Sequence, residues 1–347
     1  MRKHVLPLLL LVTLLSGMLC FPAAAEEAPK FKNYDKALSW VKKNHPAELT
    51  LEDVRFKPRE LLNLRANMAE GGVLHFSTFW CGTTITDRDT YIDLNKGKVS
   101  VSQADVEALI ALCPDLKKIR FSAHRNLSNK IMIPMIEKYP DIEFVWLLSL
   151  NRAHVIPTDA TAYSTFNNPN DDYKLRSSDL ELLRYVPGLK GLDLGHNSIT
   201  TLEWLRYCPD LEFLILADNW ISDVTMIGTL SHLQYLEIFL NEPLADISPI
   251  GQCTELLDLN ISANNKVTDL TALDSLQKLE RMWGTRMYGL TDETKEHFIA
   301  THPDTLTYFT RYHSTEHGWR KHERYKHYIW CLKNKTWIPF DQPLPSK

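Results

Sequence analysis

One short sequence, repeated with small changes between Leu189 and Met287, limits the folds open to this chain more than any other feature. The repeated segments read LKGLDLGHN, LEFLILADN, LQYLEIFLN, LLDLNISANN and LERMWGTRM. Their first leucines are 22, 22, 23 and 23 residues apart, at Leu189, Leu211, Leu233, Leu256 and Leu279. A fixed period in this range with the pattern L-x-x-L-x-L-x-x-N predicts a solenoid whose stacked units bury one continuous apolar core.

Two polar residue types recur with the same period. Asparagines at the end of each strand are expected to hydrogen-bond backbone groups left unpaired by the turning chain; they are Asn197, Asn219, Asn241 and Asn264. Aspartates in the second half of each unit are expected to cap short 3-10 turns; they are Asp223, Asp246 and Asp269. Both sets are therefore interpreted as structural.

The segment from Leu189 to Leu279 resembles the 22-residue class of leucine-rich repeats in bacterial internalins. The longer units before it are similar to ribonuclease-inhibitor-type repeats. The resemblance implies an α/β leucine-rich-repeat solenoid, with a curved parallel β-sheet on the concave face and helices and 3-10 turns on the convex face. It also implies protein recognition on the concave face. The last residues, QPLPSK, carry no wall-sorting motif, so we do not expect wall anchoring.

Four segments are expected along the chain. Residues 1–25 resemble a secretory signal peptide, because basic residues precede the apolar run 5–19 and Ala23 to Ala25 form an A-x-A cleavage site. Residues 26–72 are predicted to be an N-terminal cap, 73–310 the solenoid with an insertion near 150–175, and 311–347 a C-terminal helical cap and tail. We therefore expect a secreted or periplasmic protein without a membrane span. Lipid attachment at Cys20 is an alternative that Met18 and Leu19 disfavour, because they are not small.

The units before Leu189 are less regular. We expect strands at 91–94, 116–121, 142–148 and 162–166, with helices at 104–112, 131–138 and 178–185. The five cysteines that remain after cleavage are expected to be buried apolar side chains rather than a disulfide framework. Cys208 and Cys253 lie two units apart, roughly 10 Å at strand spacing, which is beyond bridging distance.

The residues between the buried leucines are expected to point to the concave face, because strand side chains alternate. The resulting row is Phe144, Trp146, Asp193, Phe213, Ile215, Tyr235, Glu237, Phe239, Asp258, Arg281 and Trp283. It is more apolar than solvation requires, and its interspersed charges are typical of a recognition surface for a protein or peptide. The alternative is that the 150–175 insertion covers these side chains, or that they only stack along the sheet.

The C-terminal residues are predicted to form a helix from Thr315 to Leu332. Its aromatic residues are available for burial, which favours a C-terminal cap. Its histidines do not follow the H-E-x-x-H spacing of zinc sites, so no metal is expected. Between Arg311 and Lys335 the chain has seven Lys and Arg against two Glu, so an anionic cell-wall polymer is an additional candidate partner.

No motif indicates catalysis. The sequence contains no glycine-rich phosphate loop and no G-x-S-x-G elbow, so we expect neither an enzyme nor a cofactor. The net charge of −4 gives no reason to expect a nucleic-acid partner. The leading hypothesis is an exported, non-catalytic protein- or peptide-binding module. The alternative is a structural or glycan-binding component of the cell envelope.

Overall fold

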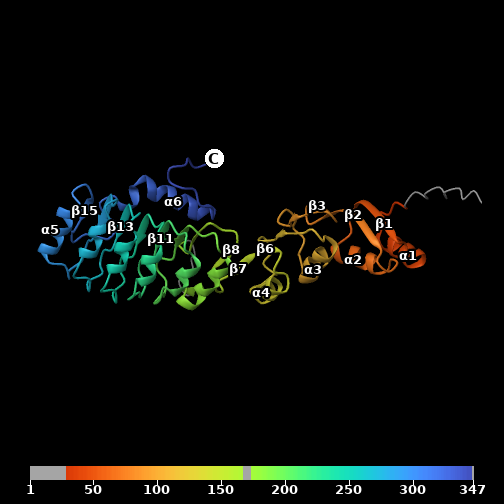
Figure 1. The fold of residues 1–347 in the computed structure, drawn as a ribbon, viewed down its shortest axis with the longest axis horizontal. Helices are drawn as coiled ribbons and strands as arrows, with labels where there is room; N and C mark the ends of the chain where they lie inside the picture. Colours follow the sequence, from red (N-terminus) through yellow and green to blue (C-terminus); the bar gives the residue numbers. More distant parts are fainter. Residues whose placement is uncertain (1–28, 167–172, 346–347) are drawn as a thin grey trace, which may run out of the picture.

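The structure is a computed structural model that describes residues 29–166 and 173–345. The expected signal peptide, residues 1–25, lies outside the described residues. Figure 1 shows an elongated body in which the sheets follow one another along the long axis. In the described ranges, no helix has both the length and the apolar character needed to cross a membrane.

The N-terminal unit is a small three-stranded sheet with two helices. Its elements are α1 (Tyr34–Asn44), β1 (Glu48–Val54), α2 (Pro58–Ala66), β2 (Val73–Trp80) and β3 (Thr83–Thr86). Strands β1 and β2 are parallel, and β3 returns antiparallel to β2. Proline occupies the first turn of α2, where the missing N–H would have had no helical partner.

The first repeats form a parallel sheet with the strand order β4-β5-β6. The elements are β4 (Tyr91–Asp93), α3 (Gln103–Leu112), β5 (Lys118–Arg120), α4 (Asn129–Lys138) and β6 (Glu143–Val145). An antiparallel hairpin, β7 (Leu147–Ser149) and β8 (Val155–Pro157), then interrupts the parallel order. Trp146 and Leu189 are 43 residues apart, and both this hairpin and the strand expected at 162–166 lie between them.

The remaining repeats form a second parallel sheet of seven strands. The strands are β9 (Ala162–Ser164), β10 (Gly191–Asp193), β11 (Phe213–Ile215), β12 (Tyr235–Glu237), β13 (Asp258–Asn260), β14 (Arg281–Trp283) and β15 (Leu306–Tyr308). The return segments are η2 (Ser177–Tyr185), η3 (Glu203–Tyr207), η4 (Thr225–Thr229), η5 (Ser248–Gln252), η6 (Thr271–Ser275) and α5 (Asp292–Thr301). Two more elements follow, η7 (Trp319–Lys321) and α6 (Glu323–Asn334). The expected leucine-rich-repeat solenoid is confirmed.

The asparagine ladder has the role expected from the sequence. Asn219 shows the pattern: its Nδ2 donates to the carbonyl oxygens of Leu194 and Leu216, at 3.0 and 3.1 Å. Its Oδ1 accepts the backbone N–H of Ile199 at 3.0 Å. The aspartates also act as expected, since Asp223 accepts the backbone N–H of Thr225 at 2.8 Å at the start of η4.

We expect Asn219→Ala to lower the free energy of unfolding by about 2 kcal/mol, because it leaves buried backbone groups without partners. Asp223→Ala is the control, because this side chain hydrogen-bonds the backbone at an exposed turn. Its loss should stay near 0.5–1 kcal/mol, roughly that of a weak cap. Urea denaturation of both variants gives the comparison, and equal losses would contradict the structural weight given to the ladder.

The five cysteines of the described ranges are buried and unbridged. Burial raises the pKa of the Cys113, Cys208 and Cys253 thiols to about 12 each. The thiolate is the reactive form of cysteine, so these three side chains behave as apolar core residues rather than nucleophiles.

Candidate binding face

The concave face of the second sheet is covered by the end of the chain. We call residues 314–340 the C-terminal segment; Figure 1 shows its helix α6 lying across the strands of this sheet. The side chains beneath it, named the covered face, are Asp193, Phe213, Ile215, Tyr235, Glu237, Phe239, Asp258, Arg281 and Trp283, and all are buried. Of the two alternatives left open by the sequence, an open recognition surface and a covered row, the structure has the row covered. The cover is the C-terminal segment. From the described part of the 150–175 insertion, Ala162 joins the same apolar cluster, Thr161 accepts the backbone N–H of Trp337 and Ser164 donates to Asp193.

Aromatic rings form the centre of this contact. Phe213 stacks on Tyr235 with 4.5 Å between ring centroids, and Tyr328 of α6 packs against Phe213 at 4.7 Å. Further along the sheet, Trp319 packs against Trp283 at 4.8 Å. Burying these rings removes a large apolar area from water, which is the physical reason that the row does not remain exposed.

Gly191 gives a sequence signal for this cover. A Cβ atom at this position would lie 2.7 Å from ring atoms of Trp337, so only glycine leaves room for the indole. The Trp337 ring in turn stacks on Tyr328 with centroids 5.0 Å apart. A glycine in the middle of an otherwise large concave row marks a close approach by another group.

The charged residues of the covered face are paired with the C-terminal segment. Asp258 accepts hydrogen bonds from Arg324 Nε at 2.7 Å and Nη2 at 3.2 Å, and also from Arg281 Nε. Burial opposes the charge of Arg324, but its hydrogen bonds to Asp258 and Glu280 raise its pKa further above the ordinary value. Arg324 therefore keeps its charge, and this buried contact depends on both partners.

Glu237 forms the second polar centre. Its carboxylate accepts the indole N–H of Trp319 at 2.8 Å and Arg320 Nη2 at 3.3 Å. It also accepts the hydroxyl of Tyr235, whose pKa is raised well above its ordinary value by burial and by this carboxylate. The cluster therefore holds a guanidinium and an indole of the C-terminal segment in place.

Asp193 lies next to this cluster without a cation in direct contact among the described residues. Its carboxylate accepts the Ser164 hydroxyl at 2.8 Å and the Gly195 N–H at 3.1 Å. Burial raises the pKa of Asp193, and the nearby charge of Glu237 adds to the rise. The folded protein therefore binds this proton more tightly than the unfolded chain does.

This pKa shift makes a testable pH prediction. The contribution of Asp193 to stability is fully present below its unfolded pKa and is lost as pH rises through the folded pKa. We expect Asp193→Asn to raise the thermal midpoint at pH 7 relative to wild type, with the difference shrinking toward pH 4. A variant that is less stable than wild type at pH 7 by the same margin as at pH 4 would contradict this assignment.

Phe144 and Trp146 do not belong to the concave row, so their assignment is corrected. Strand β6 pairs Phe144 with Ile119, a core residue, and Glu143 with Lys118. Trp146 packs in the core against Tyr185 at 5.7 Å. In this unit the leading residue Ile142 directly precedes β6, whereas one residue separates Leu189 from β10. A shift of one residue exchanges the two faces of a strand.

The basic C-terminal residues are only partly available to an anionic polymer. Arg320 and Arg324 are paired with the carboxylates of the sheet. Exposed lysines remain on the segment, so polymer binding stays a prediction.

The histidines of the segment do not gather at one point. His327 contacts the carbonyl of Ile338 at 2.8 Å. In the described part of the chain, no group of three or more His, Cys, Asp or Glu side chains is positioned to bind a metal.

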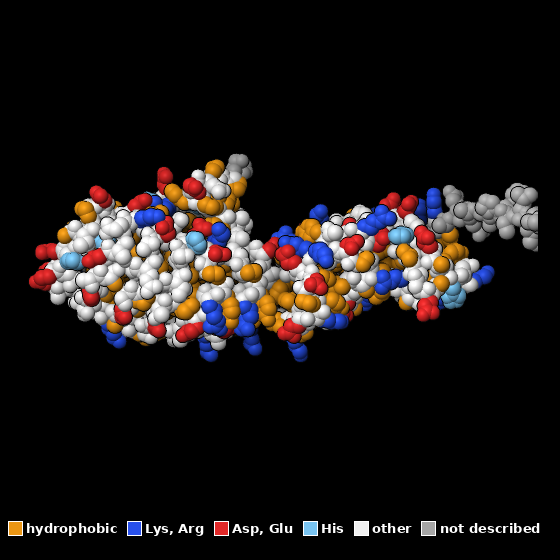
Figure 2. All heavy atoms as spheres, viewed as in Figure 1, with side chains coloured by type: hydrophobic (Ala, Val, Ile, Leu, Met, Phe, Trp, Pro, Cys, Tyr) orange, Lys and Arg blue, Asp and Glu red, His pale blue; other side chains and the backbone are white. Residues whose placement is uncertain are grey.

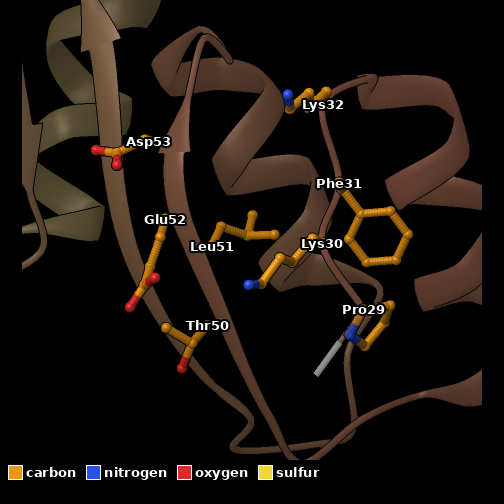
Figure 3. A pocket seen from close by; sticks show the side chains of 8 residues that line it. All are labelled: Pro29, Lys30, Phe31, Lys32, Thr50, Leu51, Glu52 and Asp53. Carbon is orange, nitrogen blue, oxygen red and sulfur yellow. The ribbon is translucent and has the colours of Figure 1, made fainter. Parts of the chain in front are cut away.

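Two other surfaces have fewer side chains suited to recognition of a partner. A hollow of about 520 Å³ at the N-terminal end is lined by Pro29, Lys30, Phe31, Lys32, Thr50, Leu51, Glu52 and Asp53, whose side chains are drawn in Figure 3. It mixes both signs of charge and begins at the first described residue. On the face drawn in Figure 2, acidic and basic side chains are interspersed, without a large region of one sign. Neither surface has the concentration of aromatic and charged groups found on the covered face.

The repeats, the parallel sheet and the asparagine ladder define the fold class as a leucine-rich-repeat solenoid. No family model matches the chain, and no curated protein matches it. Among solved structures it is similar to an internalin of Listeria monocytogenes, at 17% identity over 82% of this chain and 72% of that one, with a TM-score of 0.40. Internalin C2 of the same organism is 18% identical over 60% and 83% of the chains, with a TM-score of 0.32. A leucine-rich-repeat protein of Leptospira interrogans is 17% identical over 78% and 62%, with a TM-score of 0.33.

Proposed function

We propose that this protein is a non-catalytic binding module that recognises a protein or peptide on the covered face. One observation carries the proposal: the face already holds a polypeptide segment, and it does so with stacked rings and paired charges. Its strands form a rigid sheet, so the contacting side chains are held in place before a partner arrives, which limits the entropy lost on binding. An external partner must move the C-terminal segment aside.

The polar groups of the face favour a polypeptide over a glycan. Glu237 and Asp258 accept hydrogen bonds from indole and guanidinium groups, which are side chains of proteins. The signal-like residues 1–25 support export to a secreted or periplasmic location, which fractionation of expressing cells tests directly.

A peptide selection tests the binding role. A phage-displayed peptide library is panned against the full chain carrying Trp319→Ala, which weakens the hold of the C-terminal segment. The affinity of each selected peptide is then measured for that chain and for the same chain with a second change, Glu237→Gln. We expect the second change to weaken binding at least tenfold, because Glu237 lies at the centre of the face.

Trp220→Ala is the matched control for the second change. Trp220 is 58% exposed and is not a residue of the covered face, so its removal should leave the affinities unchanged. Circular dichroism and urea denaturation establish that each chain is folded. Peptides whose affinity is the same with and without Glu237→Gln would overturn the proposal.

A further inference from the structure

The covered face without its cover would be acidic and aromatic. Three of its residues, Asp193, Glu237 and Asp258, are carboxylates, and Arg281 is its one cation, a net charge of −2. The C-terminal segment places two arginines over it, Arg320 and Arg324. With both arginines in place, the formal charges of the covered face and of these two side chains balance.

The geometry of these contacts selects particular side chains. Arg324 contacts Asp258 through both Nε and Nη2, a planar fork that the single ammonium group of lysine does not reproduce. Trp319 places its ring over Arg281, with the guanidinium carbon 4.5 Å from the ring centroid, and donates its N–H to Glu237. An arginine and a tryptophan thus each have a specific place.

The fit of the chain's own segment is incomplete. In the described residues, Arg281 Nη2, Arg320 Nε and the Tyr328 hydroxyl are buried without hydrogen-bond partners. Each such group costs free energy, because it has lost water and gained no substitute. Displacement of the segment would return the Arg320 and Tyr328 groups to water, and a ligand that accepts a hydrogen bond from Arg281 Nη2 would have a further advantage over the internal segment.

The strands of the sheet do not depend on the segment for their backbone hydrogen bonds; beside β9, the N–H of Thr161 donates to the carbonyl of Lys335 in the segment at 3.2 Å. Strands β9 to β15 pair with one another throughout. The segment is held mainly through side chains, with Asn260 donating to the carbonyl of Ser314 and Trp283 to that of Glu316. Departure of the segment therefore leaves the strand ladder intact.

We infer that the C-terminal segment holds the covered face as an internal ligand, and that the external partner is a polypeptide segment bearing arginine and tryptophan that displaces it. This inference rests on the proposed function and adds the chemistry of the partner. The placement of Trp319, Arg320 and Arg324 gives the pattern that such a partner reproduces: an indole over the Arg281 guanidinium and arginines against Glu237 and Asp258.

The test uses a labelled synthetic peptide of residues 314–340 and an analogue with Arg320→Gln and Arg324→Gln. Both are titrated by fluorescence anisotropy into the full wild-type chain, a Trp337→Ala chain and a Trp220→Ala control. Removing Trp337 weakens the internal segment while leaving Glu237 and Asp258 in place. We expect the peptide to bind the Trp337→Ala chain at least tenfold more tightly than the other two chains. The glutamine analogue should bind that chain at least tenfold more weakly than the peptide.

Several results would overturn the inference. One is equal binding of the peptide and its glutamine analogue. Another is that the peptide does not bind the Trp337→Ala chain, although hydrogen exchange shows that the C-terminal segment of that chain has left a solenoid that is still folded. A concentration-dependent wild-type dimer that exchanges C-terminal segments would make the occupant a second copy, and the external partner would be wrong.

The library selection separates this inference from the proposed function. Peptides that depend on Glu237 but lack arginine would leave the proposed function standing and refute the partner chemistry. Failure to select any peptide that depends on Glu237 would refute both.

Discussion

Replacing Asp258 with alanine is expected to lower the free energy of unfolding by about 3–5 kcal/mol, because it removes the carboxylate that two buried cations share. Asp258 is completely buried and contacts both Arg281 and Arg324. The loss arises from Arg281, which is left without a carboxylate partner, and from Arg324, which keeps only Glu280, and not from a large net gain by the original pairs. Urea denaturation at neutral pH measures it.

The control is an ion pair with the same spacing on the outside of the solenoid. Lys278 and Glu255 are 2.7 Å apart and, like Arg281 and Asp258, come from neighbouring repeats 23 residues apart. Both side chains are exposed, so Glu255→Ala should cost only about 0.2–1 kcal/mol. Similar losses for Asp258→Ala and Glu255→Ala would mean that water reaches the covered face, contrary to the structure.

The contrast between these two pairs shows what the repeat sequence predicts and what it omits. The period placed Lys278, Glu255, Asp258 and Arg281 in neighbouring units and gave the alternation of their side chains. The asparagine positions were predictable for the same reason, because each is determined by contacts within one unit or its neighbour. The residues in these contacts lie within one or two repeats of each other in sequence, so the repeat pattern predicts them.

The cover over the face is a contact of a different kind. Trp319 donates a hydrogen bond to Glu237, which is 82 residues away in sequence, and Trp337 donates one to Glu212, which is 125 residues away. The sequence indicated that the aromatic helix would be buried and that the concave row was too apolar to be solvated. Nothing in the spacing of either segment identifies the other as its partner. Gly191 was the one local sign of a close approach.

The misplacement of Phe144 has a separate cause. The leading residue Ile142 and the strand β6 are one residue closer than in the later units, so a register extended from Leu189 assigns the wrong face. The pattern of core and surface residues along IEFVWLL is ambiguous because Phe144, Val145 and Trp146 are all apolar. Alternation fails as a guide wherever both faces of a strand are buried.

The second large effect is expected for Trp319→Ala, which should release the C-terminal segment while the solenoid stays folded. Removing a buried tryptophan typically costs about 3–5 kcal/mol, from lost burial and the cavity left behind. Trp319 is fully buried and contacts Trp283, Tyr235 and Glu237. Because repeats are stabilised mainly by their neighbours, the loss should fall on the docking of the segment. Limited trypsin digestion with mass spectrometry should show faster cleavage at Arg320, Lys321, Arg324 and Lys326.

Trp204→Ala is the matched control, because Trp204 is another fully buried tryptophan but lies in η3, in the main core of the solenoid. Its loss should lower the urea midpoint of the whole protein, without selective cleavage after residue 319. If Trp319→Ala lowers that midpoint as far as Trp204→Ala does, with no preferential cleavage in α6, the segment is an integral part of the fold. A segment that leaves on its own, by contrast, exposes a face whose acidic and aromatic side chains are already arranged by the repeats. The two outcomes therefore decide whether the end of this chain is a fixed part of the solenoid or an occupant that a partner replaces.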